Sequence, residues 1–281
     1  MQDVVSTARE SRTADFPAPS RWSRLRRRLA KTTEQAARAA DPVCRTWTVA
    51  LIASVMMGAL PVLICAAMLT PLHQVISALV LAPVVWTCAR RDDWALGMLV
   101  LATTFTAHSL TMIAITVVAP DVGFELVPDG EAYWLKQRAW ITSGEDPEYK
   151  WQAWGPAHAQ LLAGTTLYSL TSLGAITIHQ GFYEVDLMNY YNGRLIGISR
   201  NPVVALWFGW HLWSLLRGVG YVVLTYELAS LGLQITMGCQ LASWRDRAIR
   251  WGVGIGFLLL DATAKWYLLE IVRRQLNANL M

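Results

Sequence analysis

One imidazole and two carboxylates fall within eight residues in the second half of the chain, at His179, Glu184 and Asp186. Together with His211, they offer the nitrogen and oxygen donors that bind zinc and other transition metals. Their spacing does not match a helical His-Glu-x-x-His arrangement or another metal motif. The alternative interpretation of this segment is an amphipathic loop at a membrane surface. Because the spacing matches no known motif, we assign neither a bound metal nor a catalytic residue from it.

The densest polar and aromatic cluster of the sequence surrounds these carboxylates. Its members are Glu184, Asp186, Asn189, Tyr190, Tyr191, Asn192 and Arg194. If the chain has a functional site, we expect it where this cluster meets His211 and Arg217.

Ionisable side chains also occur inside the apolar runs, where each needs a partner or a purpose because insertion into a bilayer costs at least about 2.5 kcal/mol. They are His108, His179, His211, Arg217, Glu227, Asp261 and Lys265. Asp261 and Lys265 are spaced to pair on one helix face, either as structural neutralisation or as a proton or ion relay. Arg217 and Glu227 would lie about 15 Å apart along one helix, so each would have to reach another segment. Arg217 could equally mark a helix break at the water surface.

Several cofactor and catalytic motifs are absent from the sequence. It has no GxxxxGK[ST] phosphate loop, no GxSxG nucleophile turn and no CxxCH haem attachment. The cysteines at 44, 65, 88 and 239 form no CxxC pair, which predicts neither a disulfide framework nor a zinc site. Scattered histidines could ligate haem, but their spacing indicates no such pair, so no cofactor is assigned.

The composition excludes a water-soluble domain. Of the 281 residues, 54% are hydrophobic and only 16% are charged, whereas a soluble domain carries about 25% charged residues. The apolar residues gather in runs of about 18 or more, the length needed to cross a hydrocarbon core. These features exclude a soluble enzyme, a secreted disulfide scaffold and a disordered chain.

The predicted fold class is all-α, a polytopic helical membrane bundle of about six transmembrane helices, with seven possible. We expect a basic tail (1–47), a three-span segment (48–119), an acidic Trp-rich outer loop (120–157), a second membrane segment (158–272) and a C-terminal tail (273–281).

The division of the second membrane segment depends on one long apolar run. A fourth span is expected at about 156–182, and the polar stretch 183–201 is expected to connect it to the next span at the membrane surface. The run 202–235 would extend about 50 Å as a single helix, so it is counted once, or twice with a break near 217–220. The last span is expected at about 251–272.

Basic residues predict the orientation, because they mark the cytoplasmic side of a membrane protein. Residues 1–47 contain ten Lys and Arg against five acids, a juxtamembrane cluster suited to anionic lipid rather than to nucleic acid. Within it a helix is expected over 21–40, lying in the headgroup layer or forming a solvated linker. A cytoplasmic N-terminus places Arg90, Arg91, Arg194 and Arg200 inside and the acidic loop outside. A helix cap is also expected at residues 146–148.

Two functional interpretations follow. The first is a non-enzymatic cell-membrane protein, permease-like or an assembly subunit, with buried polar groups that line a path or bind a partner. The second is an intramembrane enzyme, possibly metal-dependent, that uses His179, Glu184, Asp186 and His211. The expected partners are the lipid bilayer and other membrane subunits or a second copy. The glycines at 252, 254 and 256 suit close helix contact, either within the bundle or with a partner chain.

Overall fold

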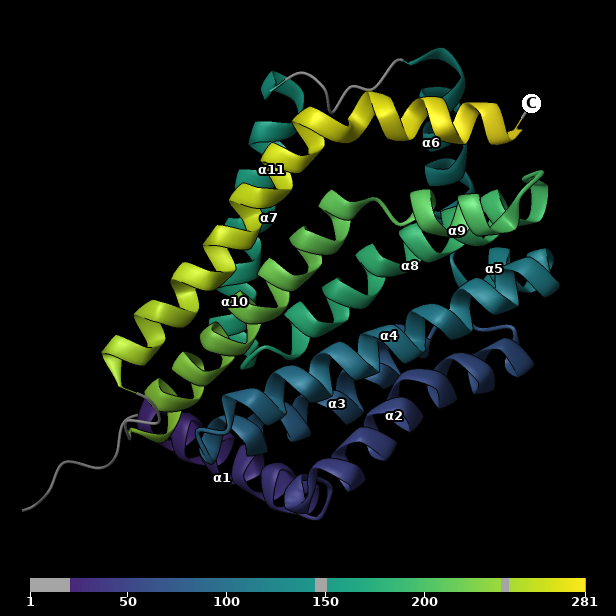
Figure 1. Ribbon diagram of the computed structural model, residues 1–281. Helices are drawn as coiled ribbons and strands as arrows, with labels where there is room; N and C mark the ends of the chain where they lie inside the picture. Colours follow the sequence, from purple (N-terminus) through teal and green to yellow (C-terminus); the bar gives the residue numbers. More distant parts are fainter. Residues whose placement is uncertain (1–20, 145–150, 239–242, 281) are drawn as a thin grey trace, which may run out of the picture.

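The structure is a computed structural model that describes residues 21–144, 151–238 and 243–280. Within these ranges every regular element is a helix and there is no strand, which confirms the all-helical class (Figure 1). The elements are α1 (Arg21–Ala40), η1 (Val43–Arg45), α2 (Trp47–Met68), α3 (His73–Arg90), α4 (Trp94–Val118), α5 (Pro120–Leu126), α6 (Gly130–Ser143), α7 (Trp151–Ser172), α8 (Ala175–Ile198), α9 (Pro202–Gly209), α10 (Leu212–Met237) and α11 (Trp244–Leu280). The helix cap expected at residues 146–148 lies outside the described residues.

Apart from α1, seven of the described helices have 18 or more residues: α2, α3, α4, α7, α8, α10 and α11. They run back and forth between the two ends of one elongated bundle (Figure 1). Short turns between α2 and α3, α3 and α4, and α7 and α8 make successive helices antiparallel.

Four of these helices, α2, α3, α4 and α10, are long and apolar enough to cross a membrane. The 22 residues of α2 extend about 33 Å, which matches a hydrocarbon core of about 30 Å. The first three helices agree closely with the first three expected spans. The expected total of six transmembrane helices is not confirmed.

The structure corrects the expected loop at residues 183–201. This segment continues as helix to Ile198, and the chain instead turns at Leu173 and Gly174, whose φ values of 55° and 86° are left-handed. That turn splits the expected span 156–182 into α7 and α8. The polar side chains of α8 lie on a helix because the neighbouring helices bury them and satisfy many of their hydrogen bonds.

The alternative break at residues 217–220 is also wrong. Helix α10 passes through this segment without interruption, and the chain breaks earlier, at Trp210 and His211, between α9 and α10. Asn201 caps α9 by accepting hydrogen bonds from the amides of Val203 and Val204. Arg217 fits inside a helix because its charge is paired with an acid on α11.

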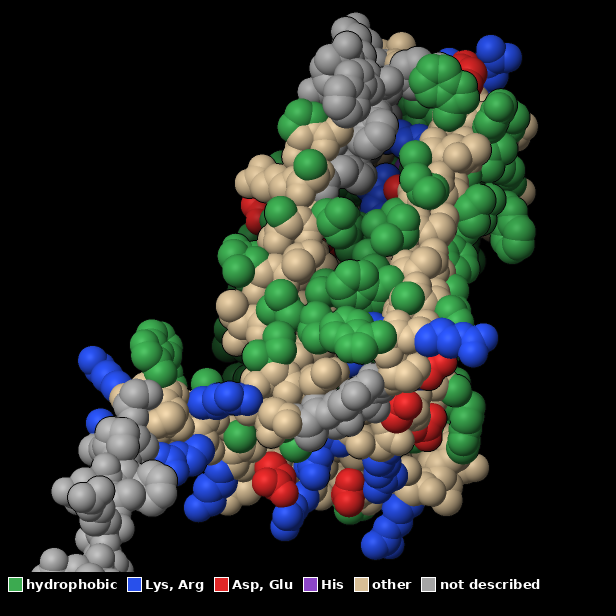
Figure 2. Space-filling model, turned by 90° about the vertical axis from the view of Figure 1, so that its left-hand side faces the viewer, with side chains coloured by type: hydrophobic (Ala, Val, Ile, Leu, Met, Phe, Trp, Pro, Cys, Tyr) green, Lys and Arg blue, Asp and Glu red, His purple; other side chains and the backbone are tan. Residues whose placement is uncertain are grey.

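Hydrogen bonds between distant segments identify the two ends of the bundle. At the α1 end, Arg250 of α11 meets Asp92, and Arg26 of α1 donates to the carbonyl of Ile235 at the end of α10. At the other end, Arg194 of α8 meets Glu131 of α6. Figure 2 shows most of the Lys and Arg side chains of its face gathered at the α1 end, beneath a largely apolar surface.

This arrangement corrects the expected placement of Arg194 and Arg200. Both lie at the α6 end, together with residues 120–144 of the acidic segment, and away from Arg90 and Arg91. The reason is the turn at residues 173–174, which adds a crossing of the bundle before Arg194.

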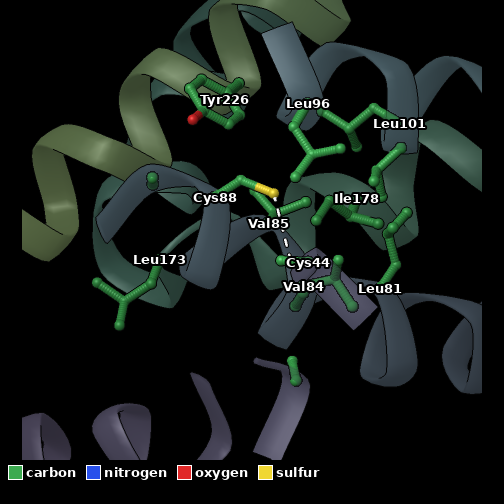
Figure 3. Packing of buried hydrophobic residues seen from close by; sticks show 14 of the residues in the cluster. Cys44, Leu81, Val84, Val85, Cys88, Leu96, Leu101, Leu173, Ile178 and Tyr226 are labelled. Atoms are coloured by element: carbon green, nitrogen blue, oxygen red, sulfur yellow. Dashed lines mark hydrogen bonds between the residues drawn. The ribbon is translucent and has the colours of Figure 1, made fainter. Parts of the chain in front are cut away.

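A continuous apolar core joins η1, α3, α4, α8 and α10 (Figure 3). The Sγ atoms of Cys44 and Cys88 lie 3.7 Å apart in this core, a hydrogen-bond contact between two thiols rather than a disulfide. Tyr226 of α10 packs into the same core. The core holds α3, α4 and α8 together, the helices that carry the candidate site.

Candidate functional site

The carboxylate of Asp186 lies between two histidines in the interior of the bundle. His73 Nε2 is 2.8 Å from Asp186 Oδ2, and His108 Nε2 is 2.8 Å from Asp186 Oδ1. All three side chains are 0% exposed. We call these three residues the His–Asp–His centre.

Two amide side chains complete the surroundings of the carboxylate. Gln74 Nε2 donates to Asp186 Oδ2 at 2.8 Å, and Asn189 Nδ2 donates to Asp186 Oδ1 at 3.2 Å. The carboxylate therefore accepts two hydrogen bonds at each oxygen when both imidazoles carry their hydrogen on Nε2, which is consistent with an ionised acid.

Three separate helices position the centre. His73 is the first residue of α3, and the middle portions of α4 and α8 carry His108 and Asp186. The rings of the two histidines stack with centroids 5.5 Å apart. Phe182 packs against His108 at 4.6 Å and stacks on Phe105, so aromatic rings cover this side of the centre.

The other two acids that are buried among the described residues are neutralised differently. Asp261 accepts hydrogen bonds from Arg217 at 2.8 and 3.2 Å. Glu227 lies 3.5 Å from Arg247 and 3.3 Å from Arg250. Within the described residues, Asp186 has ion-pair contacts only with histidines. It is thus a buried acid without a permanently charged partner.

The structure does not bring together the set expected from sequence. His179 is half-buried on α8, and Glu184 is exposed and accepts a hydrogen bond from Gln180 at 2.9 Å. His211 lies at the α9–α10 junction, stacked on Trp213. Of the four residues, Asp186 alone belongs to the one group of three metal-ligand side chains found among the described residues.

The remaining candidates have structural contacts at other places. Arg194 pairs with Glu131 at 2.6 Å and contacts the Tyr190 hydroxyl, while Asn192 is buried and donates to the carbonyl of Met188. Lys265 is half-buried on α11, one turn beyond Asp261. Arg217 and Glu227 of α10 both pair with residues of α11, so each finds its partner on a helix other than its own.

Sequence reasoning missed His73 and Gln74, and it noted His108 only as a charge within a span. His73 follows a turn, and its distance from Asp186 along the chain is 113 residues. The available signal was chemical: Asp186 has no Lys or Arg within one helical turn on either side. Such an acid, once helical, has to find its partner on another helix.

No protein-family model, curated protein or solved structure matches the chain. The fold and the centre therefore define it only as an all-helical protein with four helices compatible with a membrane and a buried His–Asp–His centre. Its functional class is inferred below from these features.

Proposed function

We propose that the chain is a multi-pass membrane protein of the permease-like class that takes up a cation at the His–Asp–His centre. In this proposal the seven long helices cross the bilayer, with the α1 end in the cytoplasm and the α6 end outside. The burial of Asp186 without a fixed positive partner is the observation that carries it.

The outward apolar surface supports insertion in a membrane. On α2 alone, Ile52, Leu63 and Ile64 are 60%, 48% and 52% exposed. A soluble monomer rarely exposes contiguous apolar surface on this scale, whereas lipid tails cover it without loss. The basic residues near α1 support the orientation, since Lys and Arg favour the cytoplasmic side.

The charge of the centre supports cation uptake. With two neutral imidazoles, Asp186 leaves one negative charge in the bundle interior, and an uncompensated buried charge costs several kcal/mol. The acids at 227 and 261 avoid this cost because arginine side chains of the same chain pair with them. Asp186 can be neutralised only by a cation that arrives from solution and can leave again. Reversible uptake of an ion at an enclosed site is what a permease requires.

A second candidate is an intramembrane metal-dependent enzyme. Two imidazoles and one carboxylate hold several metals while leaving coordination positions open for a substrate. However, all three ligand side chains are 0% exposed, so an organic substrate has no direct access to them. A small ion fits this enclosure better, which is why we favour the permease-like function.

Sealed proteoliposomes containing the full-length protein test the proposal. An inward gradient of protons or of a divalent metal is imposed, and entry is followed with an internal fluorescent indicator. We compare wild type with Asp186→Asn and with Glu184→Gln, which changes an exposed acid of the same helix. We expect cation entry in wild type and in Glu184→Gln. In Asp186→Asn we expect entry that is at least tenfold slower. No entry in wild type, or equal entry in Asp186→Asn, would overturn the proposal.

A further inference from the structure

The geometry points to a divalent transition metal, with Zn²⁺ as its representative, bound by His73 Nε2, His108 Nε2 and a carboxylate oxygen of Asp186. This inference rests on the proposed function and names the cation. The three donor atoms lie within 4.8 Å of one another.

The distances suit a metal after a small expansion. Zinc binds histidine nitrogen and carboxylate oxygen at about 2.0–2.2 Å, which puts neighbouring ligands of a tetrahedral site about 3.3–3.5 Å apart. The two nitrogen–oxygen distances in the centre are 2.8 Å. Side-chain movements of about half an ångström therefore bring both nitrogen–oxygen distances to the value of a coordination site.

The donor types select the class of metal. Imidazole nitrogen is a ligand for Zn²⁺, Fe²⁺, Cu²⁺ and Ni²⁺, whereas Mg²⁺ and Ca²⁺ prefer oxygen donors throughout. Two of the three donors here are imidazoles. We therefore expect millimolar Mg²⁺ not to compete.

An independent observation is the set of buried polar atoms that lack hydrogen-bond partners among the described residues. Asn189 Oδ1 is one of them, on an amide whose nitrogen already contacts Asp186, so this side chain can turn an oxygen toward the metal as a fourth donor. Asn189 is 0% exposed, which leaves no bulk water to satisfy that oxygen.

The histidines also have suitable groups on their far sides. When Nε2 binds a metal, the hydrogen of a neutral imidazole moves to Nδ1 and needs an acceptor. The Nδ1 atoms of His73 and His108 and the hydroxyls of Ser77 and Thr104 are all buried and lack partners within the described part of the chain. Ser77 lies one helical turn after His73, and Thr104 one turn before His108, so each hydroxyl is on the face of its histidine.

Charge balance then predicts a further ligand. A divalent ion exceeds the single negative charge of Asp186 by one. A negatively charged ligand such as hydroxide, bound in addition to the Asn189 oxygen or in its place, would restore neutrality inside the bundle.

The test is Zn²⁺ binding to full-length, tag-free protein that has been purified in detergent and stripped with a chelator. Equilibrium dialysis against a series of buffered Zn²⁺ concentrations, raised in 5-fold steps through the roughly micromolar range, gives the stoichiometry and the Kd. Wild type and Glu184→Gln are expected to bind one Zn²⁺ per chain, with at least tenfold weaker binding in Asp186→Asn and His108→Gln. Binding in wild type no tighter than in these two variants would overturn the inference.

X-ray absorption of Zn²⁺-loaded wild type provides a measurement that does not depend on the folding of a variant. It should show two imidazoles, oxygen ligands and no sulfur, and a sulfur-containing or all-oxygen shell would overturn the inference. The two proposals fail separately. If proton entry requires Asp186 but the protein does not bind Zn²⁺, only the metal proposal is overturned. If the protein binds Zn²⁺ but no cation entry depends on Asp186, only the permease-like function is overturned.

Discussion

Arg217 of α10 holds Asp261 of α11 through two hydrogen bonds, Nε to Oδ2 at 2.8 Å and Nη2 to Oδ1 at 3.2 Å. The side chains are 24% and 7% exposed, so the pair is largely removed from water. Its two ends are 44 residues apart along the chain, and it joins the two helices that form the most extensive helix pair of the bundle. It neutralises an acid with a resident arginine, the arrangement that Asp186 lacks.

Replacing Asp261 with Asn is expected to destabilise the protein by about 1–3 kcal/mol, between the values for exposed and fully buried ion pairs. The loss arises because Arg217 keeps its charge without the carboxylate that compensates it. Thermal unfolding in detergent measures the effect as a lower Tm. The double variant Arg217→Leu and Asp261→Leu should recover most of the loss, since it removes both charges. A double variant less stable than Asp261→Asn would contradict this explanation.

Close packing of α10 on α11 depends on Gly220. A Cβ atom at this position would lie 2.9 Å from the carbonyl oxygen of Gly254 and 2.9 Å from Leu258 Cδ2. Because backbone cannot yield as a side chain can, Gly220→Ala should push the helices apart and cost about 1–3 kcal/mol. Unfolding in detergent again gives the measurement.

The matched control is Gly252→Ala on α11. A Cβ atom at Gly252 meets no atom within 4 Å, so the substitution should be neutral or up to about 1 kcal/mol stabilising through helix propensity. Equal losses in Gly220→Ala and Gly252→Ala would show that the α10–α11 approach is not the cause. The sequence predicted a close-contact face at residues 252, 254 and 256. In the structure only Gly254 of these three closely approaches another helix, since a Cβ atom at Gly252 or Gly256 would meet no atom within 4 Å.

The proposed seven crossings predict that the two ends of the chain lie on opposite sides of the membrane. A fluorescent protein fused before residue 1 should be bright in the cytoplasm, whereas the same protein fused after residue 281 should be dark after export. A periplasm-active phosphatase at the second position should be active. Six crossings would instead put both fusions on the same side, and a bright C-terminal fusion would contradict the seven-helix topology.

The sequence predicted local features of the fold better than long-range ones. The helix expected at residues 21–40 and the first three spans agree with α1 to α4, because apolar length and charged stops are local signals. The turn at Leu173–Gly174 escaped prediction because α8 is rich in polar residues, whose burial depends on partners elsewhere. Within the run 202–235 the alternative break was placed at Arg217 instead of residues 210–211, since the pairing of Arg217 with α11 cannot be read locally.

The candidate site was predicted only through Asp186. Its partners His73 and His108 are on two other helices, and no spacing along the chain encodes that meeting. The expected set at residues 179, 184, 186 and 211 was based on proximity in sequence. In the structure, helical periodicity places Glu184 at the surface and Asp186 in the interior, although they are two residues apart.

The most direct test of the account compares the stability of Asp186→Asn and wild type in the presence of a metal chelator and at a pH well above neutrality, where cations for the centre are scarce. If Asp186 is a buried charge that waits for a cation, Asp186→Asn should be at least as stable as wild type, and added Zn²⁺ should raise the Tm of wild type alone. Asp261→Asn, by comparison, should be less stable than wild type. A loss of stability in Asp186→Asn as large as that in Asp261→Asn, with no response of wild type to any added cation, would contradict the account.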